Sequence, residues 1–103
     1  MNEDYNVNSI FGGNYTQLEN AMKIATARQE IISQNIANVN TPGYEALDFD
    51  AQLMKAVKRQ NEKRVILEQE MAALVQNSTD YSTLAKIYTS KLGTLRTIAR
   101  QGR

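Results

Sequence analysis

The sequence predicts an all-α fold in which two long helices form an antiparallel coiled-coil hairpin, completed by packing against neighbouring subunits. Two apolar stripes support this, one within residues 15–40 and the other within residues 65–103. In both stripes the spacing alternates between four and three, which is the 3.5-residue repeat of a left-handed coiled coil. The only proline of the chain, Pro42, falls between them. We therefore expect a Thr-Pro-Gly turn and a short connector, residues 41–64, to join the helices.

Length and composition limit what the chain can do. Its 103 residues fit one small domain with a limited core, and only 7% are aromatic. A net charge of +1 argues against a dedicated nucleic-acid binder, which usually has a strong basic excess. Without cysteine or histidine, disulfides and the commonest zinc ligands are excluded. No apolar run approaches the ~20 residues that span a bilayer, and the acidic, asparagine-rich start does not resemble a cleavable signal peptide.

The first helix is expected over residues 15–40, after a flexible segment of residues 1–14 that holds four asparagines and a Gly-Gly pair. Thr16 followed by Glu19 fits a capping box at its start. Gln29 is the one polar interruption of its stripe. The apolar residues of this seam are Leu18, Met22, Ala25, Ile32, Ile36 and Val39.

The turn follows from the chemistry of Thr41, Pro42 and Gly43. The proline ring clashes with the preceding residue and pushes Thr41 out of the α region. Pro42 has the φ required at the second position of a β-turn, and Gly43 can take the positive φ that a type II turn needs next. Asn38 and Asn40 suit the end of a helix, because asparagine tolerates the left-handed conformation.

The connector divides into three parts. Apolar and polar residues alternate between Glu45 and Asp50, so this part is expected to be extended. Asp50 is then expected to cap a short helix that carries Leu53, Met54 and Val57. Residues 55–64 hold five basic residues and one acid, which predicts a solvated connection.

The second helix is expected over residues 65–103. Ser78 is the one plainly polar residue of its stripe, and Gly93 within it costs ~1 kcal/mol relative to alanine. Further apolar residues beside both seams make the stripes wider than a hairpin needs, which favours contacts between subunits. The apolar seam residues of this helix are Leu67, Met71, Leu74, Tyr81, Ala85, Tyr88, Leu92 and Leu95.

Catalytic chemistry is not indicated, and no cofactor or metal is expected. There is no phosphate-binding glycine loop. Asp48 and Asp50 could be imagined as a metal or acid–base site, but without further carboxylates at a calcium-loop spacing a solvated turn is favoured. Glu68 and Glu70 lie two residues apart on a helix and do not face the same way. The basic residues from Lys86 onward complement the dipole at a helix C-terminus better than they predict a nucleic-acid surface.

Three blocks, residues 28–50, 67–92 and 93–100, resemble the flagellar basal-body rod proteins, most closely those of the proximal rod. The resemblance implies a structural subunit that polymerises helically into a hollow shaft, which transmits torque and conducts exported subunits. The residues of the family's turn motif would end the first helix and direct the next segment outward. They are Asn35, Ile36, Ala37, Asn38, Thr41, Pro42, Gly43 and Tyr44.

Partners and location also come from this resemblance. The implied partners are other copies of the chain, neighbouring rod proteins, the adaptor at the membrane ring and, in transit, the flagellar type III export apparatus. The location would be the periplasmic rod, reached without a cleaved signal peptide. The stretch from Asp50 to Leu67 is shorter than the insertion common in the family, so a large outer domain is not expected. The alternative function is a soluble helical-hairpin adaptor or export chaperone; a nucleic-acid binder is a third, weaker hypothesis.

Overall fold

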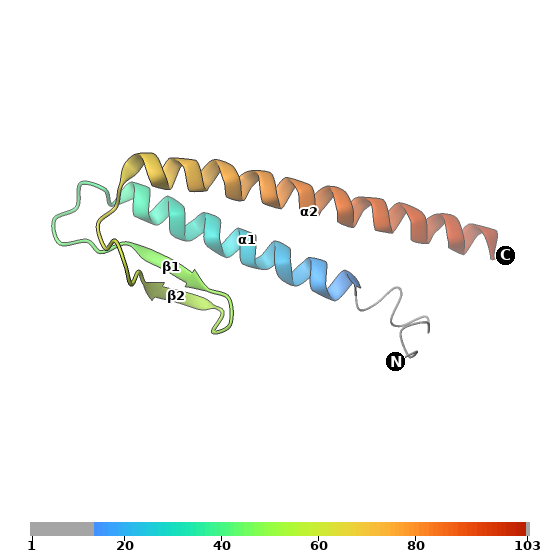
Figure 1. Ribbon diagram of the computed structural model, residues 1–103. Coiled ribbons are helices and arrows are strands. Elements are labelled where there is room, and N and C mark those ends of the chain that lie inside the picture. The colour runs from blue at the N-terminus through green and yellow to red at the C-terminus, as the bar shows by residue number, and fades with distance from the viewer. Residues whose placement is uncertain (1–13, 103) are drawn as a thin grey trace.

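Two antiparallel helices and a small sheet beside them make up the computed structural model, which describes residues 14–102 (Figure 1). Helix α1 is Asn14–Ala37 and helix α2 is Leu67–Gln101; between them lie strands β1, Leu47–Asp50, and β2, Lys55–Lys58. The predicted flexible segment, residues 1–14, lies outside the described residues apart from Asn14. The prediction of a mostly helical chain with two long helices is confirmed.

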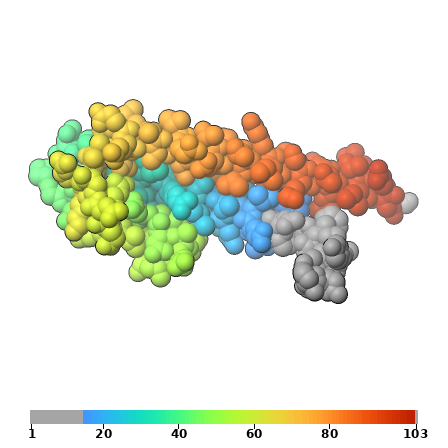
Figure 2. All heavy atoms as spheres, in the orientation of Figure 1, coloured from blue at the N-terminus to red at the C-terminus, as the bar shows by residue number. Residues whose placement is uncertain are grey.

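The shape is elongated, with extents of 63 × 26 × 15 Å. Its radius of gyration is 18.5 Å, whereas a compact domain of this length would have about 13 Å. Helix α2 forms a long narrow arm, and the connector gathers at the opposite, wider end (Figure 2). An elongated hairpin leaves little room for a core: among the described residues, only six side chains are buried. They are Ala25, Ile31, Asn35, Ala46, Glu70 and Asn77.

Helix α1 begins at Asn14, so Thr16 lies inside its first turn. It ends at Ala37, before the predicted boundary at residue 40. Beyond it the backbone bonds span three residues instead of four, since the Val39 N–H donates to the Ile36 carbonyl at 3.2 Å and the Thr41 N–H to the Asn38 carbonyl at 2.9 Å. The side-chain Nδ2 of Asn38 also donates to the Gln34 carbonyl, at 2.8 Å. Asparagine side chains that bond the backbone locally compete with helix continuation.

The all-α prediction needs one correction, because β1 and β2 form a two-stranded antiparallel sheet. Its register pairs Leu47 with Lys58 and Asp50 with Lys55. The extended conformation expected from the alternation at Leu47 and Phe49 is therefore part of a hairpin. Val57, a β-branched residue suited to a strand, lies opposite Asp48.

The short helix predicted after Asp50 is also wrong. The Asp50 carboxylate does accept backbone N–H bonds from Gln52 and Leu53, at 2.9 and 3.0 Å, as a capping residue would. However, Met54 has a φ of 54°, in the left-handed region, which stops the helix after one turn. The chain then returns as β2, so the first part of the predicted solvated connection is a strand.

Helix α2 is 35 residues long and runs through Gly93 without a break. Ile66 precedes it and offers no side-chain cap. Two acidic residues in the first turn, Glu68 and Glu70, favour this terminus by interacting with the helix dipole. At the other end the N–H of Gly102 donates to the carbonyl of Ile98 at 3.0 Å.

Candidate functional site

The feature that ties the elements together is the amide of Asn35, near the end of α1, which has no exposed surface. Its Nδ2 donates to the Leu47 carbonyl at 2.9 Å and to Glu70 Oε1 at 3.2 Å. Its Oδ1 accepts the Leu47 N–H at 3.0 Å and the Tyr44 hydroxyl at 2.9 Å. An asparagine amide has two donor hydrogens and two acceptor lone pairs, so every one of its bonding positions is used.

Through these contacts the Asn35 side chain makes the hydrogen bonds to Leu47 that a neighbouring strand would make. It pairs with both the N–H and the carbonyl of Leu47, the first residue of β1. The end of α1 is thereby connected to the sheet, and the bond to Glu70 connects it to the first turn of α2. We call the group Asn35, Tyr44, Leu47, Arg59 and Glu70 the joint.

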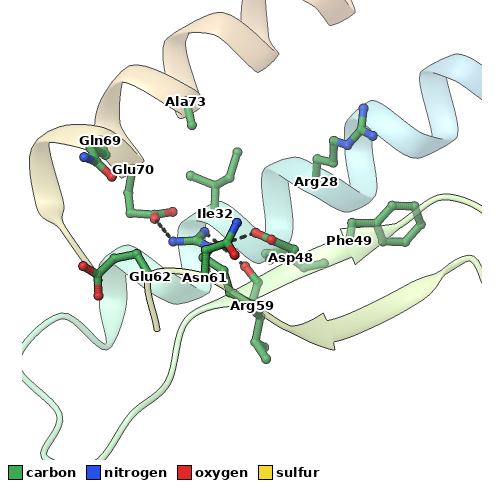
Figure 3. A pocket seen from close by; sticks show the side chains of 12 residues that line it. Arg28, Ile32, Asp48, Phe49, Arg59, Asn61, Glu62, Gln69, Glu70 and Ala73 are labelled. Atoms are coloured by element: carbon green, nitrogen blue, oxygen red, sulfur yellow. Dashed lines mark hydrogen bonds and ion pairs between the residues drawn. The ribbon is translucent and has the colours of Figure 1, made fainter. Parts of the chain in front are cut away.

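Arg59, just after β2, supplies the positive charge of the joint. It donates to Asp48 Oδ1 at 2.9 Å and to Glu70 Oε2 at 2.8 Å, and Figure 3 shows it lying between these two carboxylates. A third bond reaches the Leu47 carbonyl at 3.3 Å. Glu70 is only 2% exposed, so removing Arg59 would leave a buried carboxylate without its counter-charge.

Two pKa values reflect this arrangement. The hydrogen bond that Arg59 donates to the Glu70 carboxylate is the main cause that raises the pKa of Arg59, with Asp48 adding to it and burial opposing it. The pKa of the Tyr44 hydroxyl is raised mainly by burial and then by the negative charge of Glu70, against a smaller lowering by Arg59. Both shifts favour the protonation states present at neutral pH.

The turn that leads into the joint lies at the surface. The Tyr44 N–H donates to the Thr41 carbonyl at 3.2 Å, and Gly43 has a φ of 79°, the conformation for which glycine was expected at this position. Thr41 Oγ1 also donates to Asn38 Oδ1 at 3.0 Å. Thr41, Pro42 and Gly43 are exposed, whereas Asn35 and Tyr44 come together in the joint.

The rest of the turn motif has lesser contacts. Ile36 and Asn38 are half-buried and Ala37 is exposed. Ala46, which lies outside the motif, is fully buried. Its N–H donates to the Lys63 carbonyl at 2.7 Å and its carbonyl accepts the Arg59 N–H at 3.0 Å, so the connector is fastened to the start of β1 as well.

A second polar cluster lies midway along the helices. Asn77, only 7% exposed, donates to the Ala25 carbonyl at 2.7 Å and to Gln29 Oε1 at 2.9 Å. Gln29 Nε2 in turn donates to Ser78 Oγ at 3.2 Å. The polar interruptions noted in the two stripes, Gln29 and Ser78, thus face each other. A polar contact at one level of a helix pair favours one register over others.

The apolar seam residues are distributed unevenly. In the first stripe Ala25 is buried and the other five are half-buried, of which Val39 lies beyond the end of α1. On α2, Leu67, Met71 and Tyr81 are exposed, while the other five are half-buried. The buried line of α2 instead begins with Glu70 and Asn77, which are seven residues apart and lie beside the predicted seam.

Sequence reasoning missed Arg59, Glu70 and Asn77. Arg59 was included in a solvated connection, and Glu70 was considered only as a catalytic acid. The seven-residue spacing of Glu70 and Asn77 was present in the sequence, but a heptad search that follows apolar residues passes over polar ones. Tyr15 adds a contact at the far end of the hairpin, where its ring meets that of Tyr88 edge to face at 5.4 Å.

Beside the joint there is a groove of about 570 Å³, lined by both helices and the connector (Figure 3). Its most buried charges are already paired with each other through Arg59. Asp48 bonds Arg59 and Asp50 holds a turn, so this pair has structural roles. Within residues 14–102 no group of three or more acidic residues is placed to hold a metal, and no helix is long and apolar enough to cross a bilayer. The joint therefore connects α1, α2 and the sheet, and its role is structural.

Comparison with known proteins finds a family match for the segment that contains most of α1 and the turn motif. The family model described as flagella basal body rod protein matches residues 17–44, from the first turns of α1 to the end of the turn. The flagellar basal body rod protein FlgB of Bacillus subtilis is 40% identical over 73 residues, which are 71% of this chain and 47% of the relative.

Two further relatives carry the same description. FlgB of Escherichia coli K12 is 34% identical over 65 residues, covering 61% of this chain and 44% of the relative. FlgB of Buchnera aphidicola is 48% identical over 44 residues, covering 43% and 30%. The chain therefore spans less than half the length of these curated relatives.

Proposed function

The chain belongs to the family of flagellar basal-body rod proteins, and from that premise we propose that it is a structural subunit of the proximal rod. The observation that carries the proposal is that the matched segment, residues 17–44, supplies two residues of the joint. Asn35 and Tyr44, both in the family's turn motif, bond to each other and fasten β1 to α1. The family is structural and not enzymatic, in agreement with the expectation from the sequence.

Assembly would supply the packing that one chain lacks. Three of the six buried side chains are polar, so hydrophobic burial within the described part of the chain is small. Large apolar side chains remain exposed along α2, among them Met71 at 53% and Val75 at 66%. We propose that the helices complete their coiled-coil contacts against neighbouring subunits and that Leu67, Met71 and Tyr81 take part. Burying such side chains is favourable by about 1.5–3 kcal/mol each.

The joint would set the direction in which the connector leaves the helices. A shaft that transmits torque needs a fixed angle between its helices and its outward segments. Fully bonded polar networks in a low-dielectric interior are rigid and tolerate few alternative geometries. We propose that the motif residues from Asn35 to Tyr44 end α1 and hold the β1–β2 hairpin in one orientation.

The finer parts of the proposal rest on the family resemblance. They are a helical, hollow rod in the periplasm, export by the flagellar type III apparatus without a cleaved signal, and contacts with neighbouring rod proteins and the adaptor at the membrane ring. Residues 15–40 and 65–103 would act as one structural domain whose helices line the channel. The names of the relatives say only that they are flagellar basal body rod proteins.

The test is whether the purified chain gains helix as it polymerises. We expect a partly unfolded monomer in dilute solution and a rise in ellipticity at 222 nm together with a sedimenting polymer at high concentration. A stable, cooperatively folded monomer that never polymerises would contradict a rod subunit. A small defined oligomer that binds a single client would instead favour a helical-hairpin adaptor or export chaperone.

A further inference from the structure

The turn between β1 and β2 exposes two large apolar side chains. Leu53 is 59% and Met54 52% exposed, at the end of the hairpin farthest from the joint (Figure 1). The turn is held in shape, because Asp50 accepts the N–H groups of Gln52 and Leu53. Met54 has a φ of 54°, which glycine or asparagine adopts more readily. We call Leu53, Met54 and the adjoining Lys55 the tip.

A second apolar surface lies on α2. Leu67, Met71 and Val75 are spaced four residues apart, so they form one line along the helix. All three are exposed, while Glu70, between the first two in sequence, faces the joint. We call Leu67, Met71 and Val75 the ridge.

The two surfaces carry opposite charge. Lys55 at the tip is positive, whereas Glu68, next to Leu67 on the ridge, is negative, and both are exposed. The buried Glu70 and its partner Arg59 belong to the joint and add to neither surface. Apolar contact combined with complementary charge favours binding between the two surfaces and selects its orientation.

One chain cannot make this contact with itself. Strand β1 packs on α1, and α1 lies between the sheet and α2 (Figure 1). The tip and the ridge are therefore on opposite sides of α1. We infer that the tip of one copy docks on the ridge of a second copy. Because the two surfaces differ, the contact is head to tail, and repeating it generates a ring if the rotation closes and an open helical array if it does not. The proposed rod corresponds to the open array. This inference rests on the proposed rod function and assigns one of its subunit contacts.

A crosslinking experiment tests the contact, because the chain has no cysteine of its own. Leu53→Cys and Met71→Cys variants are mixed under polymerising conditions and oxidised. We expect a disulfide-linked dimer from the mixture and none from either variant alone. The matched control mixes Leu53→Cys with Ile98→Cys, since Ile98 is 44% exposed on α2 but lies outside the ridge. A mixture that crosslinks no better than this control would overturn the inference.

Charge reversal gives a second readout. Lys55→Glu or Glu68→Lys alone should lower the crosslinked fraction about two- to fivefold at low salt, the range expected for an exposed ion pair. The doubly reversed chain should recover it. Polymers that form without the crosslink contradict the tip–ridge contact and leave the rod function standing. A chain that forms no polymer at any concentration contradicts both.

Discussion

Replacing Asn35 by alanine is the sharpest perturbation of the joint. The Leu47 N–H would lose its partner, and an unsatisfied buried donor costs about 1–3 kcal/mol. Loss of the bond to the charged Glu70 adds about 1.5 kcal/mol. The Leu47 carbonyl keeps its bond from Arg59, and alanine improves helix propensity by about 0.5 kcal/mol. The free energy of unfolding should therefore fall by about 2–4 kcal/mol.

The assay is urea unfolding of the assembled chain at one fixed protein concentration, followed by ellipticity at 222 nm, with hydrogen exchange at the Leu47 amide as a local readout. Since each 1.4 kcal/mol is a factor of ten, protection of that amide should fall about thirtyfold to several hundredfold. The matched control is Ser33→Ala, an exposed position on the same helix. If Asn35→Ala lost no more stability than Ser33→Ala, the joint would not be the tie that we describe.

Three further predictions concern the turn, the joint and the helix pair. Gly43→Ala should lower the free energy of unfolding by about 1–2 kcal/mol in urea, because alanine at a φ of 79° is strained although its Cβ would meet no atom within 4 Å. In cells, motility should be lost while the protein is still expressed. Unchanged motility would mean that the turn is only a spacer. The raised pKa of Tyr44 means that the folded state holds its proton to higher pH than the unfolded state, so this contribution to stability is complete below pH 10 and is lost as the pH rises through the folded-state pKa. Stability measured from pH 8 to 11 should fall more in the parent chain than in Tyr44→Phe, because the raised pKa of Tyr88 acts in both chains. Identical profiles would refute the contribution of Tyr44. Asn77→Ala should lower the free energy of unfolding by about 1–2 kcal/mol, because the bonds to Ala25 and Gln29 are lost. Asn77→Leu should recover much of this loss by apolar burial. Equal urea midpoints for the parent chain and both variants would contradict a stabilising role of the polar cluster around Asn77.

Periodicity predicted the helices because helical stripes are a local property. The four-and-three spacing located α1 and α2, and Pro42 with Gly43 located the segment between them. The same spacing misplaced the buried line at the start of α2. Apolar Met71 faces outward there while Glu70 is buried, because the cost of burying Glu70 is offset by Arg59 and Asn35. A partner contributed from 11 or 35 residues away leaves no periodic trace in the sequence.

The prediction of a short helix after Asp50 failed for a related reason. Asp50 does hold the N–H groups that a helix start would present, so the local chemistry was predicted correctly. The path of the chain beyond Asp50 depends on the pairing of β1 with β2 and on Arg59 closing the joint. These contacts join residues that are separate in sequence, and tertiary pairing overrides a weak helical preference.

The most direct test of the central claim is a density map of an intact basal body from cells whose rod contains this chain. We predict an antiparallel pair of long helices along the rod channel for each copy, with the β1–β2 hairpin directed outward and its tip on the next copy. A rod in which no density fits the α1–α2 hairpin, in a cell that makes the chain, would contradict its role as a rod subunit.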